Sequence, residues 1–259
     1  MPNIYLINLD KSADRLIQSA SRLAEQNIEF KRLPAVLGSA LSDEKKFAHY
    51  NKRMNKNQYY YDLSAAQIGC YLSHRKAWEC IATGSEPFGI VLEDDFILNH
   101  DLNSAIKAIE EMQIPWEVIK LSAYANRARP IAYSHPITNE FEIVIHKKPI
   151  SGGAATAITK EAAQRMLDTT QQFGRPCDTD MQYFWERGVE IMSLMPFPVA
   201  QDLRYESTIS DAIGKQNRRP LQRLWLQIHQ YIKNTYHVKQ QVAKFKRITS
   251  KPIKTRIII

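Results

Sequence analysis

The stretch FGIVLEDD, residues 88–95, decides the fold of this 259-residue chain, because five mostly apolar residues run directly into three carboxylates. A short apolar run of this length is typical of a buried strand in an α/β sheet. The carboxyl ends of such strands form the crevice in which open α/β sheets bind ligands. We therefore expect Glu93, Asp94 and Asp95 to stand at the edge of a ligand-binding crevice.

The three adjacent carboxylates favour a cation, because neighbouring negative charges repel each other unless an ion holds them together. Oxygen ligands select hard ions such as Mg²⁺ or Mn²⁺. Side chains alternate along a strand, so Glu93 and Asp95 are expected on one side and Asp94 on the other. The sequence thus predicts a metal site made by Glu93 and Asp95. The alternative is an acidic strand-to-loop turn on the surface.

The flanking sequence alternates between strand and helix patterns. An apolar run at 3–9, a helical spacing over 12–26 and a second run at 28–33 predict a β-α-β unit with a parallel strand pair. The capping-box pattern SAAQ at 64–67 predicts a helix that continues to Thr83 and ends at Gly84. Residues 38–62 are expected to form a helix-containing excursion or a mobile loop. Further helices are expected at 101–112, 160–171 and from 178, further strands at 117–121, 131–133, 141–145 and 189–194, and a polar loop at 200–215.

The charge is divided unevenly along the chain. The formal net charge is +8, yet residues 212–259 hold 12 Lys and Arg with no Asp or Glu. We therefore expect a catalytic domain at 1–211 and a basic tail at 212–259, with an amphipathic helix over 221–236. Such a tail suits an anionic membrane surface, into which Leu224, Trp225 and Ile228 would insert. A nucleic-acid-binding protein that uses this tail is an alternative, but no nucleic-acid motif accompanies it, so no nucleic-acid partner is expected.

The remaining composition bears on the compartment. The three cysteines lack C-x-x-C spacing and are typical of free thiols in a reducing compartment. Neither a secretory-type N-terminus nor an apolar run of about 20 residues is evident. We expect a cytoplasmic protein, peripheral on the inner membrane.

Other candidate residues have both a structural and a functional interpretation. Nucleotide-binding glycine motifs of the G-x-G-x-x-G and P-loop types are absent from the sequence. Gly152 and Gly153 allow close approach of the backbone either to a ligand or to a packed neighbour. His74 is either a packed core residue or a contact for phosphate or sugar. Asp178 is either a helix N-cap or the carboxylate that deprotonates an acceptor hydroxyl.

Taken in order, several motifs resemble glycosyltransferase family 25, the bacterial lipooligosaccharide galactosyltransferases and their relatives. The resemblance spans about residues 4–211, and IGCYLSH at 68–74 followed by Trp78 is its most specific part. The other matching elements are Ile7-Asn8-Leu9 with Asp14-Arg15, Pro34-Ala35, VLEDD at 91–95, GGAA at 152–155, Pro176-Cys177-Asp178, Gln201 and Ser207. One departure is Thr156, where members of the family often carry a bulky residue.

The resemblance implies a GT-A-type, Rossmann-like domain with a mostly parallel sheet, a UDP-sugar donor, Mn²⁺ or Mg²⁺, and inversion at the anomeric carbon. Asp178 then becomes the candidate base, although Glu93 or Asp180 could take that role because a helix N-terminus favours the carboxylate form of Asp178. Asp94 would meet ribose or sugar hydroxyls. The residues implied to bind the donor are Asn8, Leu9, Arg15, Ala35, His74, Asp94, Gly152, Gly153, Gln201 and Ser207.

The function implied is inverting transfer of a hexose, with β-linked galactose as the first candidate, from a UDP-sugar to a lipid-linked lipooligosaccharide or lipopolysaccharide acceptor. A non-catalytic protein that binds a sugar nucleotide or a glycan is the alternative.

Overall fold

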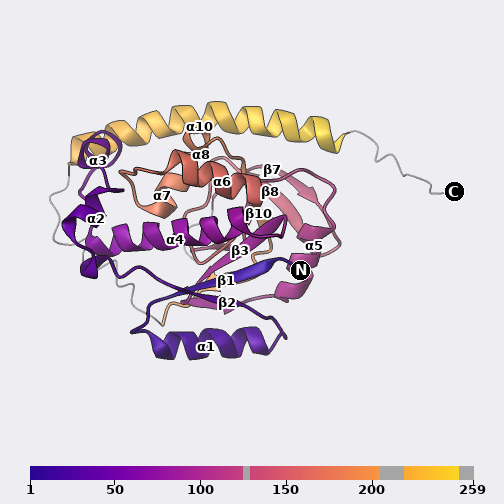
Figure 1. Ribbon diagram of the computed structural model, residues 1–259. Coiled ribbons are helices and arrows are strands. Elements are labelled where there is room, and N and C mark those ends of the chain that lie inside the picture. Colours follow the sequence, from indigo (N-terminus) through magenta and orange to yellow (C-terminus); the bar gives the residue numbers. More distant parts are fainter. Residues whose placement is uncertain (125–128, 205–218, 251–259) are drawn as a thin grey trace.

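The computed structural model describes residues 1–124, 129–204 and 219–250. Its centre is an eight-stranded sheet of order β2-β1-β3-β9-β5-β10-β8-β7 (Figure 1). These strands are β1 (Asn3–Asn8), β2 (Lys31–Pro34), β3 (Phe88–Glu93), β5 (Val118–Lys120), β7 (Ile131–Pro136), β8 (Glu142–His146), β9 (Ala155–Thr159) and β10 (Ile191–Met195). A small sheet joins β4 (Phe96–Leu98), β11 (Val199–Gln201) and β6 (Ser122–Ala123).

The α/β class of the predicted GT-A-type domain is confirmed, but the sheet is mixed rather than mostly parallel. Strands β2, β1 and β3 are parallel to one another, as the β-α-β pattern predicts. Strand β9 then runs antiparallel between β3 and β5. In the large sheet, three strand pairings are parallel and four are antiparallel. A local sequence pattern predicts that a segment forms a strand. The direction of that strand in the sheet depends on partner strands that are distant in sequence.

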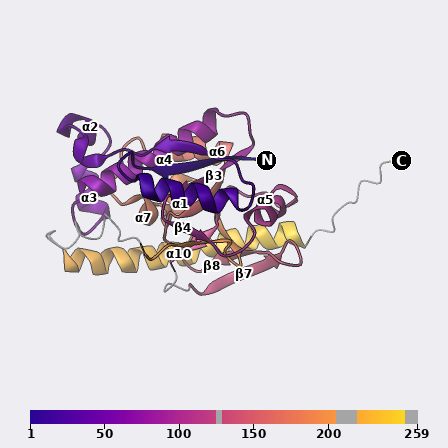
Figure 2. The same ribbon diagram turned by 90° about the horizontal axis from the view of Figure 1, so that it is seen from below.

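Helices cover both faces of the sheet (Figures 1 and 2). Helix α4 (Ala65–Thr83) packs beside α6 (Lys160–Thr169) on one face, and α1 (Ala13–Ala24) lies on the other. The shorter helices are η1 (Gly38–Ala40), α2 (Asp43–Phe47), α3 (Lys52–Gln58), α5 (Leu102–Glu110), α7 (Cys177–Met181) and α8 (Phe184–Arg187). Residues 38–62 therefore form the helix-containing excursion, not a loop without helices.

The start of α4 has the structure that its sequence predicts. The Gln67 N–H donates to Ser64 Oγ at 3.2 Å, and the Ser64 N–H donates to Gln67 Oε1 at 3.0 Å. These reciprocal bonds satisfy two backbone donors that a helix N-terminus leaves without partners. The helix ends at Thr83 with Gly84 as its C-cap, as predicted. The helix packs against β1, β3 and β9 of the sheet, and its buried Tyr71 stacks on Phe173.

The basic tail contains one helix that is longer than predicted, α10 (Pro220–Thr249). It packs on the body: Gln241 donates to the Ile191 carbonyl at 3.1 Å, and the rings of Phe245 and Tyr133 lie 5.7 Å apart. The predicted polar loop at 200–215 begins instead with the end of β11, and most of its length lies outside the described residues. Since 205–218 is not described, the division of the chain at residue 211 stays a prediction.

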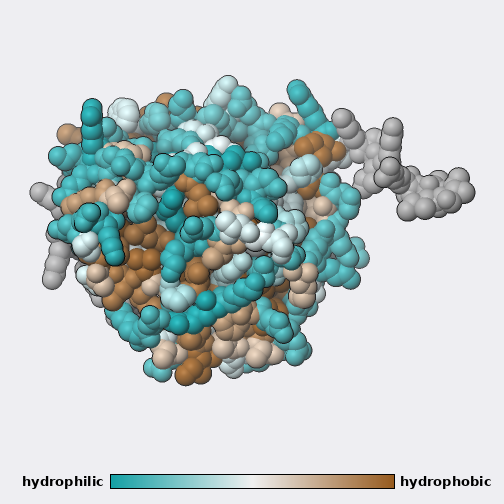
Figure 3. Space-filling view, in the orientation of Figure 1, coloured by the Kyte–Doolittle hydropathy of each residue, from teal (hydrophilic) through white to brown (hydrophobic). Residues whose placement is uncertain are grey.

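Within the described part of the chain, no helix is both long enough and apolar enough to cross a bilayer. The face seen in Figure 3 is mostly hydrophilic, with hydrophobic side chains gathered left of its centre.

Candidate functional site

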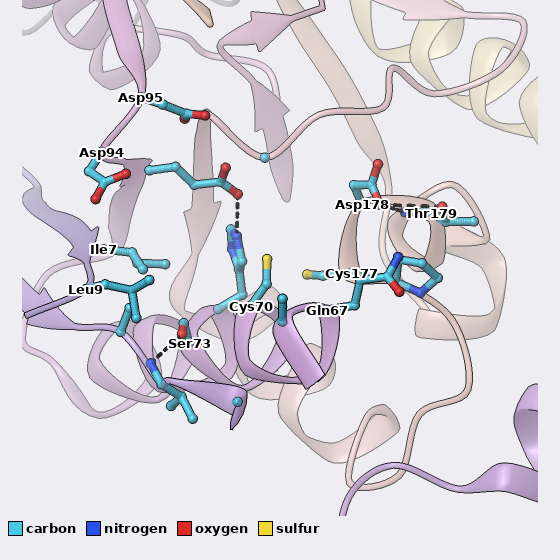
Figure 4. Close-up of a pocket in the computed structure, with 18 of the residues that line it drawn as sticks. Ile7, Leu9, Gln67, Cys70, Ser73, Asp94, Asp95, Cys177, Asp178 and Thr179 are labelled. Atoms are coloured by element: carbon cyan, nitrogen blue, oxygen red, sulfur yellow. Dashed lines mark hydrogen bonds and ion pairs between the residues drawn. The ribbon is translucent and has the colours of Figure 1, made fainter. Parts of the chain in front are cut away.

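A cavity of about 730 Å³ opens at the carboxyl ends of β1 and β3. Figure 4 shows Asp94 and Asp95 on one side of it and Asp178 on the opposite side. The fold therefore brings together residues that are far apart in sequence. The predicted site residues that line the cavity are Leu9, Arg15, Ala35, His74, Glu93, Asp94, Asp95, Gly153, Asp178 and Gln201.

Asp95 lies between the end of β3 and the start of β4, and it is only 8% exposed. Its Oδ2 accepts a hydrogen bond from Gln201 Nε2 at 3.0 Å, while its Oδ1 is buried without a hydrogen-bond partner among the described residues. Burial, and next the nearby charge of Glu93, raises the pKa of Asp95 to about 6. A buried carboxylate oxygen of this kind is costly unless a proton or a cation compensates it.

Glu93 ends β3 and forms a short contact with α4. His74 Nε2 and Glu93 Oε1 lie 2.9 Å apart. Burial alone would oppose ionisation, but the hydrogen bond and charge of His74, with the charge of Lys120, bring the pKa of Glu93 below its ordinary value. Gly153 closes over this carboxylate so tightly that a Cβ there would stand 2.1 Å from Glu93 Oε1. Glu93 is therefore held in place as an anion.

His74 is a packed residue at the edge of the cavity, and its contact with phosphate or sugar stays a prediction. Its ring lies 6.3 Å from that of Trp78 in a packed, buried setting, and it also lines the cavity.

Asp94 has different partners from Glu93 and Asp95. Asn8 Nδ2 donates to Asp94 Oδ2 at 2.7 Å, and Arg15 Nη1 donates to Asp94 Oδ1 at 3.3 Å. Asn8 is buried behind Asp94 and is not part of the cavity lining, whereas Arg15 is. The N-terminal motif thus positions the middle carboxylate of the triplet.

Glu93 also belongs to a second group of possible metal ligands. Among the described residues, one ligand atom each from Cys70, His74 and Glu93 lie within 4.8 Å of one another. Thiolate and imidazole suit Zn²⁺, whereas the carboxylates of Glu93 and Asp95 suit Mn²⁺ or Mg²⁺. The prediction of an oxygen-only site at Glu93 and Asp95 stays a prediction.

Asp178 is the second residue of α7, and Pro176 occupies the N-cap, so the N-cap interpretation of Asp178 is wrong. Its Oδ1 accepts a hydrogen bond from the Thr179 N–H at 2.7 Å. Burial raises the pKa of Asp178 despite the opposing effects of this bond and of Lys120. A raised pKa makes this carboxylate a better proton acceptor, and the five-residue helix behind it adds little dipole.

Asp180, the alternative base, is locked inside the body and does not line the cavity. It is 1% exposed and accepts hydrogen bonds from Tyr71 at 2.5 Å, Arg175 at 3.0 Å and Arg187 at 3.1 Å. It therefore anchors α7 and cannot reach an acceptor. Glu93 is a poor base as well, because its pKa is lowered.

Lys120 lies outside the cavity lining but acts on the site through its charge, which lowers the pKa of Glu93 and opposes the raised pKa of Asp178; the sequence patterns do not predict this role. It is 1% exposed in β5, donates to Thr156 Oγ1 at 3.1 Å and also donates to the Gly152 carbonyl. In the sequence, the only indication of this role is a lysine within the predicted strand at 117–121.

Gly152 is absent from the cavity lining and has a φ of +113°, so it serves the backbone turn before β9 rather than a ligand contact. Ser207 lies outside the described residues.

Comparison with known proteins shows the family to which the chain is similar. The model for "Glycosyltransferase family 25 (LPS biosynthesis protein)" matches residues 1–181. Procollagen galactosyltransferase 2 of Mus musculus is 31% identical over 123 residues, which are 45% of this chain and 20% of that protein. A glycosyltransferase 25 family member of Aedes aegypti is 32% identical over 104 residues, 36% of this chain and 16% of that protein. This chain thus matches about a fifth of the length of such curated relatives.

Among solved structures, a mutant of a Drosophila β-1,4-galactosyltransferase 7 in complex with manganese, UDP-Gal and xylobiose is similar with a TM-score of 0.39 and 10% identity. The match covers 84% of this chain and 81% of that chain.

Proposed function

This chain belongs to glycosyltransferase family 25, and on that premise we propose that it transfers a hexose, with galactose as the first candidate, from a UDP-sugar to a lipid-linked oligosaccharide of the lipooligosaccharide or lipopolysaccharide type. The observation that carries the proposal is the buried Oδ1 of Asp95, which has no hydrogen-bond partner within residues 1–124, 129–204 and 219–250. It lies beside the ionised Glu93, at strand ends that face Asp178 across the cavity. The names of the galactosyltransferase relatives support the sugar, and the family description supports the acceptor.

The residues at the triplet fit a divalent cation. Asp95 Oδ1 has no hydrogen-bond partner among the described residues, and Glu93 is held as an anion by His74 and Lys120. We assign Glu93 and Asp95 as the residues that would hold Mn²⁺ or Mg²⁺. When bound, the cation would neutralise the charge of the departing diphosphate.

The other side chains have roles that follow from their positions. Asp94, fixed by Asn8 and Arg15, would accept hydrogen bonds from donor hydroxyls. Asp178 would take the proton from the acceptor hydroxyl, because it lies across the cavity from the triplet and burial raises its pKa. Attack from the side opposite the diphosphate would invert the anomeric carbon.

The proposal separates an enzyme from a protein that only binds sugar nucleotides. We expect UDP to raise the melting temperature in the presence of Mn²⁺ and to do so much less without it. Ligand at 100 times its dissociation constant adds roughly 2.7 kcal/mol to the free energy of unfolding. A panel of UDP-sugars, assayed for Mn²⁺-dependent hydrolysis and for transfer to a soluble oligosaccharide, then identifies the donor.

Three results would overturn the proposal in different ways. A shift with DNA or RNA but none with UDP would favour the nucleic-acid alternative. A shift with UDP and no turnover of any UDP-sugar would favour a binding module. Turnover with a procollagen acceptor only would replace the proposed acceptor.

A further inference from the structure

Helix α10 presents a row of large apolar side chains to solvent. We call this row the outward stripe; its members are Leu221, Leu224, Trp225, Ile228, Tyr231, Ile232 and Tyr236, each between 53% and 84% exposed. They recur three or four residues apart, so they share one side of the helix. A contiguous apolar surface of this kind marks an interaction site, whereas single exposed apolar residues do not.

The side of α10 that faces the body is more polar than its outer side. Gln230, Asn234 and Gln241 are buried there together with Leu226, Val238 and Phe245. Both polar side-chain atoms of Asn234 are buried without a hydrogen-bond partner among the described residues. A surface helix ordinarily turns its apolar side toward the core. In α10 the side with both polar and apolar residues is buried against the body, and the outward stripe stays exposed to solvent.

The positive charge of α10 indicates which kind of surface fits the outward stripe. Residues 220–249 contain six Lys and Arg and no Asp or Glu. Lys244 pairs with Glu190 at 2.9 Å, but Lys233 and Lys239 are exposed and no ion pair involving them is found in the described part of the chain. An acid-free helix with Trp and Tyr beside Lys fits an anionic lipid surface. A second copy of the chain would instead bring two cationic helices together.

The stripe begins at the mouth of the cavity. The Arg219 N–H donates to the Tyr60 carbonyl at 2.8 Å, and the Arg223 guanidinium lies 5.2 Å from the Tyr60 ring. Tyr60 and Arg223 both line the cavity. From this point α10 runs across the molecule on the side away from α1 (Figure 1).

We propose that the outward stripe lies in the headgroup region of an anionic bilayer, with α10 parallel to the membrane plane, and holds the cavity mouth at the lipid surface. The bilayer would be the inner membrane, with the protein on its cytoplasmic face. The use of this position to meet a lipid-linked acceptor rests on the proposed function, but the membrane contact does not.

Flotation of the full chain with vesicles tests the contact. Vesicles of 30% phosphatidylglycerol in phosphatidylcholine should bind the protein, and vesicles of phosphatidylcholine alone should bind it at least tenfold less. The double variant Trp225→Ser, Ile228→Ser should lower the partition coefficient for the anionic vesicles at least tenfold. Ile17→Ser is the matched control, because Ile17 is 66% exposed on α1 and should leave binding within twofold.

The charge contribution is tested separately. Lys233→Gln with Lys239→Gln should lower binding to anionic vesicles about thirtyfold, since each of the two basic residues near such a surface contributes roughly 1 kcal/mol. Lys107→Gln on α5 removes a basic residue outside α10 and should change little. Salt at 0.5 M should weaken binding by the wild type.

Two outcomes would overturn the inference. One is wild-type protein that floats with neither vesicle, or equally with both. The other is a dimer in sedimentation equilibrium that Ile228→Ser dissociates, which would show that a second copy covers the stripe. The Mn²⁺-dependent shift with UDP needs no vesicles, so its failure would count against the proposed function and not against the membrane contact.

Discussion

At the residue scale, three adjacent carboxylates have three different electrostatic states. Asp94 is paired with Asn8 and Arg15, and Glu93 is held as an anion by His74. In the part of the chain that the structure describes, one oxygen of Asp95 has no hydrogen-bond partner. Three neighbouring carboxylates of the sequence therefore have different hydrogen-bond partners and different charge environments in the fold. Strand alternation predicts that Asp94 differs from its neighbours, but it does not predict which partners each carboxylate meets.

Asp95→Asn tests the unpartnered oxygen. Burial raises the pKa of Asp95 from its ordinary value of 3.8 to about 6, so its ionisation destabilises the metal-free fold progressively between these two values and fully above about 6. Without metal, the variant should be more stable than wild type at pH 7.5 by about 1–3 kcal/mol, and the gain should shrink as the pH falls through about 6 and vanish below about 4. It should also lose the Mn²⁺-dependent response to UDP. Thermal unfolding with and without Mn²⁺ and UDP measures both effects.

Asp94→Asn is the control for that experiment. This neighbouring carboxylate is ion-paired with Arg15, so its loss should lower stability rather than raise it. If both variants change stability in the same direction, the assigned difference between the two side chains is wrong.

The raised pKa of Asp95 also predicts how ligand binding depends on pH. A cation needs the ionised carboxylate, so affinity for UDP with Mn²⁺ should fall as the pH drops through about 6. Titration calorimetry between pH 5 and pH 8 gives the midpoint. An unchanged affinity across that range would remove Asp95 from the binding site.

Asp178→Asn should abolish transfer while UDP affinity stays within a few-fold of wild type. The reason is that Asp178 faces the triplet across the cavity and is not one of the assigned metal ligands. Asp180→Asn is the comparison for a structural role. It removes the negative charge that pairs with the buried Arg175 and Arg187, and it should lower the free energy of unfolding by about 3–5 kcal/mol. Near-normal turnover by Asp178→Asn would contradict its role as base.

At the scale of elements, sequence predicts best where the signal is local. Helix α4 begins and ends where its capping box and Gly84 place it, and β3 delivers the acidic triplet as expected. The sequence patterns do not predict the strands β9 and β11 or the full length of α10, because each depends on partners far away in the chain. For the same reason, sequence named Asp95 and Gln201 separately but did not predict that they bond to each other.

The entry of β9 beside β3 gives a prediction at this scale. Gly153→Ala would place a methyl group on Glu93 Oε1, so the carboxylate must move away from His74. We expect at least a tenfold loss of Mn²⁺-dependent UDP affinity in a protein that still folds. Gly188→Ala is the comparison: it has a φ of +64° with nothing near its Cβ, so it should lower stability by about 1 kcal/mol without affecting UDP. Equal UDP affinity in both variants would mean that the position of Glu93 does not matter for binding.

At the scale of the whole molecule, the basic tail packs on the body through its helix α10. The charge pattern predicts a membrane-associating appendage, whereas Leu226, Val238 and Phe245 are buried in the fold. Net charge and hydrophobic spacing identified the tail but could not say which side of its helix faces the body.

Phe245→Ala should therefore lower the free energy of unfolding by about 3–5 kcal/mol, because a ring 2% exposed is replaced by a cavity. Tyr236→Ala removes an aromatic side chain that is 59% exposed on the same helix, and stability should change by less than about 0.5 kcal/mol. Denaturant unfolding of both variants measures the difference. Similar losses would mean that α10 is not packed as described.

The antiparallel strand β9 has a consequence for how the protein is made. The first 123 residues can pair β2, β1 and β3, but the neighbour of β3 on its other side is not synthesised until residue 155. Until then the nascent chain carries an open strand edge that can join other chains. A message that stops before residue 155 should therefore yield an insoluble product, and ribosome-bound chains should need a chaperone until β9 emerges and closes the centre of the sheet.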